Sequence, residues 1–131
     1  MAANFVVTND ADERTYLGEY FGQAPDEYQS MRFFLMRQAL HMLSAAVFLL
    51  LGSAGKPIRR SENPPAFRDF HERIRAGEID LADNQVKIDY GMVHWEQLLQ
   101  NVRQPRFDEA LRIVPERNKR EGSGLLLPGA P

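Results

Sequence analysis

Residues 31–56 read MRFFLMRQALHMLSAAVFLLLGSAGK, and this stretch decides the fold. Its part from residue 38 to residue 55 contains no Lys, Arg, Asp or Glu. As an α-helix, this uncharged run would be roughly 27 Å long, close to the hydrocarbon thickness of a bilayer, which is about 30 Å. Asp26 and Glu27 follow a proline, which is typical of a helix start, and Gly52, Gly55 and Pro57 mark the end of the run. The sequence therefore predicts one long apolar helix over about residues 26–55.

The apolar run allows two interpretations. It is either the central helix of a soluble bundle, which can be apolar on all sides, or a single membrane span. A buried core helix usually keeps a polar stripe, and residues 45–51 have none, which slightly favours the span. In a span, the helix would pack on partner helices through small and aliphatic residues, namely Ala39, Leu40, Leu43, Ala46, Val47, Leu50 and Leu51. Long basic side chains would reach the lipid head groups at its two ends, namely Arg32, Arg37, Lys56, Arg59 and Arg60.

Length and composition limit the function classes. The chain has 131 residues, 44% of them apolar, which is enough for one domain and excludes a wholly disordered protein. It has no cysteine, so disulfides, thiolate nucleophiles and cysteine-based zinc sites within this chain are excluded. The formal net charge of −2 argues against a nucleic-acid partner, because domains that bind nucleic acid are usually basic.

The regions around the long helix predict an all-α protein with small additional elements. Residues 1–25 show little periodicity and are expected to be an extended segment. Residues 57–114 carry apolar residues at helical spacing, which predicts short amphipathic helices at 65–76, 91–103 and 107–114. Residues 78–91 alternate apolar and polar side chains, so a small hairpin is expected there, with a helix as the alternative. A proline predicts the end of the last helix, and residues 115–131 are expected to be a flexible tail.

Apolar residues outside the long helix are candidates for docking on partner proteins. Short amphipathic helices cannot cover their own apolar faces, so further subunits are expected to cover them. The candidates for partner docking are Phe67, Phe70, Trp95, Leu125 and Leu126.

The three histidines, His41, His71 and His94, are the residues that would suggest metal binding or catalysis. They lie far apart in the sequence, and no H-E-x-x-H motif, Walker-type phosphate loop or cysteine pair accompanies them. They could meet at one metal ion only if the fold brought them together. Structural or surface histidines are the simpler interpretation, so no catalytic residue, metal site or cofactor is predicted.

One resemblance to a known family concerns the order of segments from residue 30 onward. The motif SMRFF at residues 30–34 leads into the apolar run, and a charged tail ends in GLLLP at residues 124–128. This layout resembles single-span accessory subunits of mitochondrial respiratory complexes, in particular the ESSS-type subunit of complex I. The resemblance implies a place in the mitochondrial inner membrane, packing against core membrane helices, and no catalytic activity.

We therefore expect a non-catalytic accessory or assembly subunit of a membrane protein complex, such as a respiratory complex. Its expected partners are other subunits and membrane lipid, without nucleic acid or a small-molecule substrate. One alternative is a soluble, cytoplasmic helical adaptor or virion-type structural protein, in which residues 38–55 form a buried core helix. A second alternative is a small helical metal-dependent enzyme or nuclease that uses the three histidines.

Overall fold

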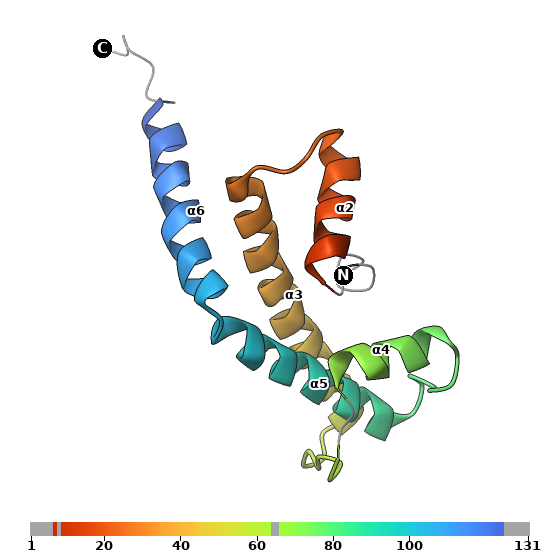
Figure 1. Ribbon diagram of the computed structural model, residues 1–131. Helices are drawn as coiled ribbons and strands as arrows, with labels where there is room; N and C mark the ends of the chain where they lie inside the picture. Colours follow the sequence, from red (N-terminus) through yellow and green to blue (C-terminus); the bar gives the residue numbers. More distant parts are fainter. Residues whose placement is uncertain (1–6, 8, 64–65, 125–131) are drawn as a thin grey trace.

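The computed structural model describes Val7, residues 9–63 and residues 66–124 of the chain (Figure 1). These residues form five helices and no strand, which confirms the predicted all-α class. In chain order the helices are α2 (Asp10–Phe21), α3 (Glu27–Ser53), α4 (Phe67–Arg75), α5 (Asn84–Val102) and α6 (Pro105–Gly124).

Helix α3 is the long apolar helix that the sequence predicts. The Asp26 carboxylate accepts the backbone N–H of Gln29 at 2.7 Å, and the Gln29 side chain accepts the backbone N–H of Asp26 at 2.9 Å. This reciprocal pair satisfies two backbone donors at the start of the helix. The helix stops before Ala54, whose left-handed backbone (φ 47°) breaks the hydrogen-bond ladder, and Gly55 (φ 78°) continues the turn. Both ends therefore follow from local sequence.

Helix α5 is the main partner of α3 within the chain. The two helices share the most extensive contact between any two described elements, and glycines allow their close approach. A Cβ atom on Gly52 would lie 2.8 Å from the carbonyl oxygen of Asn84, and one on Gly91 would lie 2.9 Å from Cγ of Leu49. Figure 1 shows α6 continuing from α5 past α3, α4 lying across α5, and α2 beside α3.

Two apolar clusters connect the other helices to this pair. The first joins Val7, Leu17 of α2 and Phe33 of α3, and Tyr16 stacks on Phe33 with 5.4 Å between ring centroids. The second joins α4 to α5 through four buried side chains, which are Phe67, Phe70, Tyr90 and Val93. Neither cluster covers Leu50 of α3, which remains 74% exposed.

The predicted extended N-terminal segment is wrong for residues 10–21, which form helix α2. Asn9 caps its first turn, because the Asn9 side chain accepts the backbone N–H of Asp12 at 2.8 Å. The buried residues of α2 are Glu13 and Leu17. Apolar periodicity does not reveal this helix, because Glu13, one of its two buried residues, carries a carboxylate.

The predicted hairpin at residues 78–91 is also wrong, since a helix begins inside this segment. The Asp83 carboxylate accepts two backbone N–H groups of the first turn, at 2.8 and 3.1 Å, so α5 begins at Asn84. Val86 and Tyr90, which contributed to the alternating pattern, are four residues apart and contact the same cluster below α4. Helical spacing therefore explains their burial without a strand.

The predicted stop at Pro115 is wrong as well, because α6 continues through this proline to Gly124. A proline inside a helix removes one backbone hydrogen bond. Contacts with the start of α3 offset that loss: the Tyr28 hydroxyl donates to Oδ1 of Asn118 at 2.6 Å, and the Arg117 guanidinium lies 4.7 Å from the centroid of the Tyr28 ring. The predicted tail is thus helical up to Gly124, and its remainder lies outside the described residues.

Helix α3 is long and apolar enough to cross a membrane. An 18-residue window within it has a mean hydropathy of 1.7, and 28% of that window is buried inside the chain. The core helix of a soluble protein can have the same length and composition, but it is mostly buried. The low burial of this window means that the chain covers α3 only in part.

Candidate functional site

The outer face of α3 is apolar and uncovered. We use this name for the side formed by Met36, Ala39, Leu40, Met42, Leu43, Ala46, Val47, Leu50 and Leu51. Its largest side chains remain open to contact, since Leu43 is 51% exposed, Leu50 74% and Leu51 55%. All residues that the sequence assigned to partner packing belong to this face, and none of them is buried inside the chain. Leu40 packs in part against the cluster of Val7, Leu17 and Phe33, and the fold leaves the exposed remainder of this face available for contact with other molecules.

The inner face of α3 carries polar and small residues and lies against α5. Among its residues Gln38, His41, Ser44, Ala45 and Gly52 are buried, and nearer the start of the helix Phe33 and Phe34 are buried as well. Nδ2 of Asn101 donates to Oε1 of Gln38 at 2.9 Å, so an amide pair connects the two helices. Over residues 38–52, α3 therefore buries polar and small side chains, whereas a helix on the surface of a water-soluble domain turns mainly its apolar side inward.

The three histidines meet in one buried aromatic cluster between α3, α4 and α5. His41, His71 and His94 are 0%, 1% and 2% exposed. Nδ1 of His41 lies 2.9 Å from Nδ1 of His94, and Nδ1 of His71 lies 3.3 Å from the hydroxyl oxygen of Tyr90. The Phe67 ring contacts all three imidazoles, with centroid separations of 5.0, 5.5 and 4.8 Å. We call this group the histidine cluster.

The hydrogen bond between His41 and His94 requires complementary tautomers, because one Nδ1 donates the proton and the other accepts it. Burial, and then the neighbouring His41 and His71, lower the pKa of His94 to about 3, so His94 is neutral at pH 7. Burial raises the pKa of Tyr90 to about 12, which keeps its hydroxyl protonated. Nε2 of His41 and Nε2 of His94 are both buried without a hydrogen-bond partner among the described residues.

The histidine cluster does not have the arrangement of a metal site. In the part of the chain that the structure describes, no group of three or more His, Cys, Asp or Glu side chains could hold a metal ion. Two imidazoles face each other through Nδ1, and the third faces a tyrosine hydroxyl. The geometry therefore gives no support to the alternative of a metal-dependent enzyme, although the histidines do come together.

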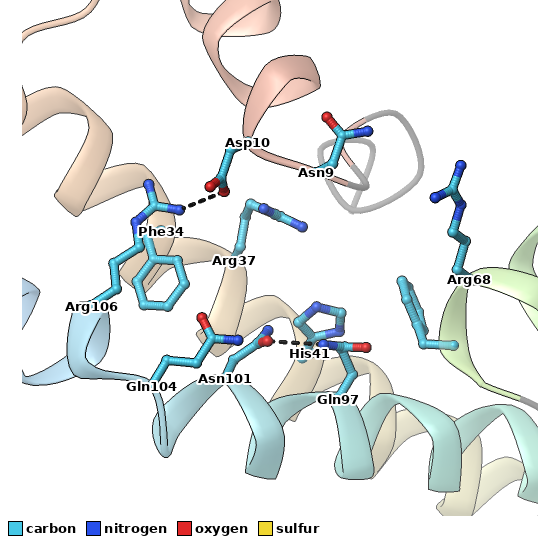
Figure 2. Close-up of a pocket in the computed structure, with 11 residues that line it drawn as sticks. Asn9, Asp10, Phe34, Arg37, His41, Arg68, Gln97, Asn101, Gln104 and Arg106 are labelled. Carbon is cyan, nitrogen blue, oxygen red and sulfur yellow. Dashed lines mark hydrogen bonds and ion pairs between the residues drawn. The ribbon is translucent and has the colours of Figure 1, made fainter.

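A polar pocket of about 210 Å³ adjoins His41 (Figure 2). Three guanidinium groups line it, from Arg37 of α3, Arg68 of α4 and Arg106 of α6. The other lining residues are Asn9, Asp10, Phe34, Phe67, Gln97, Asn101 and Gln104. We call this cavity the arginine pocket.

Glu13 of α2 holds two of these arginines in place. Its side chain is 3% exposed, and Oε2 lies 3.5 Å from Nη1 of Arg37, while Oε1 pairs with Nη2 of Arg106. Arg37 also donates to the carbonyl oxygen of Val7 at 2.9 Å, and Arg106 pairs with Asp10 at 3.2 Å. A buried carboxylate with two cationic partners fixes the side chains around it, because each buried charge needs its counter-ion.

Of the basic residues predicted to contact lipid head groups, some are exposed and others form ion pairs within the chain. Three of them are exposed near the ends of α3, namely Arg32, Lys56 and Arg59. Arg60 keeps 48% of its side chain exposed and pairs with Glu96 of α5. Arg37 is a correction, because its side chain is only 12% exposed and turns inward to Glu13. It belongs to the arginine pocket and not to a membrane interface.

The predicted docking residues are corrected in part. Phe67 and Phe70 are 7% and 4% exposed, because α4 packs them into the core of its own chain. They are not available to a partner in this fold. Trp95 is 41% exposed and remains a candidate, while Leu125 and Leu126 lie outside the described residues.

The sequence analysis did not identify two features of the fold, namely the inner face of α3 and the arginine pocket. Gln38, His41 and Ser44 recur every three residues and thus share one side of a helix, which was the available signal for the inner face. The arginine pocket left no such signal. Its ion pair between Glu13 and Arg106 joins residues 93 positions apart, so no local pattern connects them.

Comparisons of this chain with protein-family models, with curated proteins and with solved structures found no match.

Proposed function

We propose that this protein is a non-catalytic accessory subunit of a membrane protein complex, and that it docks through the outer face of α3. The single observation that supports this most strongly is the contrast between the inner and outer faces of α3. Gln38 and His41 contact α5, whereas Met36, Met42, Leu43, Leu50 and Leu51 on the opposite side are exposed, from 45% for Met36 to 74% for Leu50. Apolar surroundings, such as lipid chains or neighbouring membrane helices, suit such a surface.

The energetics favour a covered outer face. Fully burying one large apolar side chain stabilises a complex by about 1.5–3 kcal/mol. Several such side chains on the outer face lie side by side, which makes a contiguous patch instead of scattered exposed residues. The alanines Ala39 and Ala46 lie between the larger residues, and small residues let a partner helix approach closely.

The inner face restricts how α3 would enter a membrane. A span surrounded by lipid on all sides would separate α3 from α5 and leave Gln38 and His41 without their partners, Asn101 and His94. Unpaired polar groups in hydrocarbon are costly. The proposal therefore keeps α5 on the inner face, so that only the outer face meets lipid or partner helices.

The finer location rests on the resemblance to respiratory accessory subunits. We extend the proposal on that basis to a respiratory complex of the mitochondrial inner membrane. The exposed basic side chains Lys56 and Arg59, at the end of α3, would then contact lipid phosphates.

The test is alkaline carbonate extraction of the natively expressed protein, followed by mass spectrometry of the proteins that co-purify in detergent. Leu43→Asp is compared with Leu111→Asp, a matched control on α6, because the two leucines are 51% and 49% exposed. An aspartate near the middle of a membrane helix costs about 2.5–3.5 kcal/mol, so Leu43→Asp should reduce membrane retention about a hundredfold. The wild type and Leu111→Asp should both remain in the membrane pellet with the same partners.

Two results would contradict the proposal. One is a wild-type protein that leaves the membrane in carbonate and purifies as a monodisperse monomer without detergent. The other is equal retention of the two aspartate variants. A soluble wild type whose partner is lost only in Leu43→Asp would establish the soluble adaptor instead, with the outer face covered by another protein.

A further inference from the structure

We propose that the arginine pocket binds a phosphate group, held by guanidinium groups of three helices and by Nε2 of His41. This inference goes beyond the proposed membrane function, which needs no ligand. It concerns the opposite side of α3 and a different set of residues.

The first argument is geometric. Arg37, Arg68 and Arg106 come from three different helices and line one cavity of about 210 Å³. Figure 2 shows Arg106 turned to Asp10 on one side, Arg68 on the other side, and Arg37 between them with His41 below it. Donors that approach from several directions suit a tetrahedral oxyanion, whereas a planar carboxylate is usually held by one guanidinium through two parallel hydrogen bonds.

The second argument is the charge of the lining. Three guanidinium groups line the pocket, and Asp10 is the one carboxylate among the lining residues that the structure describes. Glu13, which pairs with Arg37 and Arg106, and Glu72, which pairs with Arg68, do not line the pocket, so the lining itself is positive although each arginine has a counter-ion. Because Glu13 holds two of the three arginines before any ligand arrives, little side-chain entropy is lost on binding.

The third argument is the unsatisfied nitrogen of His41. The ring is 0% exposed, its Nδ1 is engaged by His94, and its Nε2 has no partner among the described residues. A buried polar atom without a partner costs about 1–3 kcal/mol. Because His41 lines the pocket, a ligand oxygen at Nε2 would supply the partner that the described residues lack. If His94 donates its Nδ1 proton to Nδ1 of His41, Nε2 of His41 carries a proton and donates to an oxygen of the phosphate.

The experiment is a titration of the purified full-length protein with inorganic phosphate, followed by the ring ¹⁵N resonances of the histidines. Sodium chloride at equal ionic strength controls for screening, and acetate tests a carboxylate ligand. We expect saturable shifts of the His41 ring nitrogens with phosphate. The pattern expected for bound His41 is a protonated Nε2 and an unprotonated Nδ1.

Arg68→Glu is the test variant, because the Arg68 side chain is 64% exposed and forms an ion pair with Glu72 on the same helix. Arg73→Glu is the matched control, since Arg73 lies on the same helix, is 53% exposed and does not line the pocket. The phosphate dissociation constant should rise about tenfold or more in Arg68→Glu, as expected for the loss of a charged hydrogen bond, and stay unchanged in Arg73→Glu.

Three results would overturn the assignment. They are an absence of phosphate-dependent shifts at His41, equal phosphate affinity of the two variants, and acetate binding as tight as phosphate binding. None of them bears on membrane retention, so this proposal and the proposed function can fail separately.

Discussion

The two faces of α3 have opposite chemistry and opposite environments. On the inner face, amide, imidazole and hydroxyl side chains are buried against α5, while on the outer face leucine and methionine side chains are exposed. The α3–α5 contact is tight because small residues allow it and polar pairs fix its register. Helix α3 also contributes apolar side chains to the two clusters, Phe33 to the first and Phe48 to the edge of the second. The comparison teaches that the most apolar helix of the chain uses polar pairs and small residues as well as phenylalanines for its internal contacts, and leaves leucines and methionines exposed.

The largest change in stability is expected when a side chain is added to the inner face, where α3 contacts α5. A Cβ atom at Gly52 would lie 2.8 Å from Cγ1 of Ile88 and 2.9 Å from its backbone nitrogen, so Gly52→Ala must push α3 and α5 apart. We expect a loss of about 2–3 kcal/mol in the free energy of unfolding, measured by urea denaturation. Gly122→Ala on α6 is the control, because nothing lies within 4 Å of its Cβ position, and it should leave stability equal or up to about 1 kcal/mol higher. Equal stability of the two variants would show that the helices are not in close contact.

An intermediate effect is expected from acid, which acts on the histidine cluster of the inner face. The folded pKa of His94 is about 3, below the ordinary value of 6.5, so the unfolded chain takes up a proton at a pH where the folded chain does not. The stability from this group is complete above pH 6.5 and falls by about 1.4 kcal/mol per pH unit below it, down to about pH 3. At pH 5 the loss from this histidine is about 2 kcal/mol.

The measurement is urea denaturation at a series of pH values between 7 and 4.5, for the wild type and for His94→Phe. The variant lacks the titrating ring, so its stability should depend less steeply on pH. Identical slopes would mean that His94 does not titrate with the pKa that its burial implies.

The smallest effect on the fold is expected on the outer face. Leu50 is 74% exposed, and glutamine is a good helix former, so Leu50→Gln should change the unfolding free energy of the purified chain by less than about 0.5 kcal/mol. A loss above about 1 kcal/mol in the same urea experiment would show that the outer face is covered within the chain. In that case the contrast between the two faces would not hold.

Much of the fold could be predicted from sequence. The long helix and its ends were recognised, since the cap at Asp26 and the left-handed turn at Ala54 are local features. The helical character of residues 84–90 was missed, because apolar residues that serve one helix face also happened to alternate. The continuation of α6 through Pro115 was missed, because contacts with Tyr28 at the other end of the chain support it.

Some residues of the candidate sites could also be placed from sequence, whereas others depend on contacts between helices. The residues that the sequence assigned to partner packing all lie on the outer face of α3, which also includes Met36 and Met42. The sequence misplaced Arg37, Phe67 and Phe70, since each of them is turned inward by a residue of another helix. The arginine pocket could not have been found, because its walls come from five helices.

The amino-acid sequence by itself determined that this chain is all-helical, that one helix is long and apolar enough to cross a membrane, and where that helix begins and ends. Those properties depend on hydrogen bonds and side chains within a few residues of one another. Only the tertiary structure decided which side of α3 is covered, how His41 meets His94, and that three arginines surround one cavity. Those outcomes depend on contacts between residues far apart in the chain, and such contacts exist only once the helices have packed.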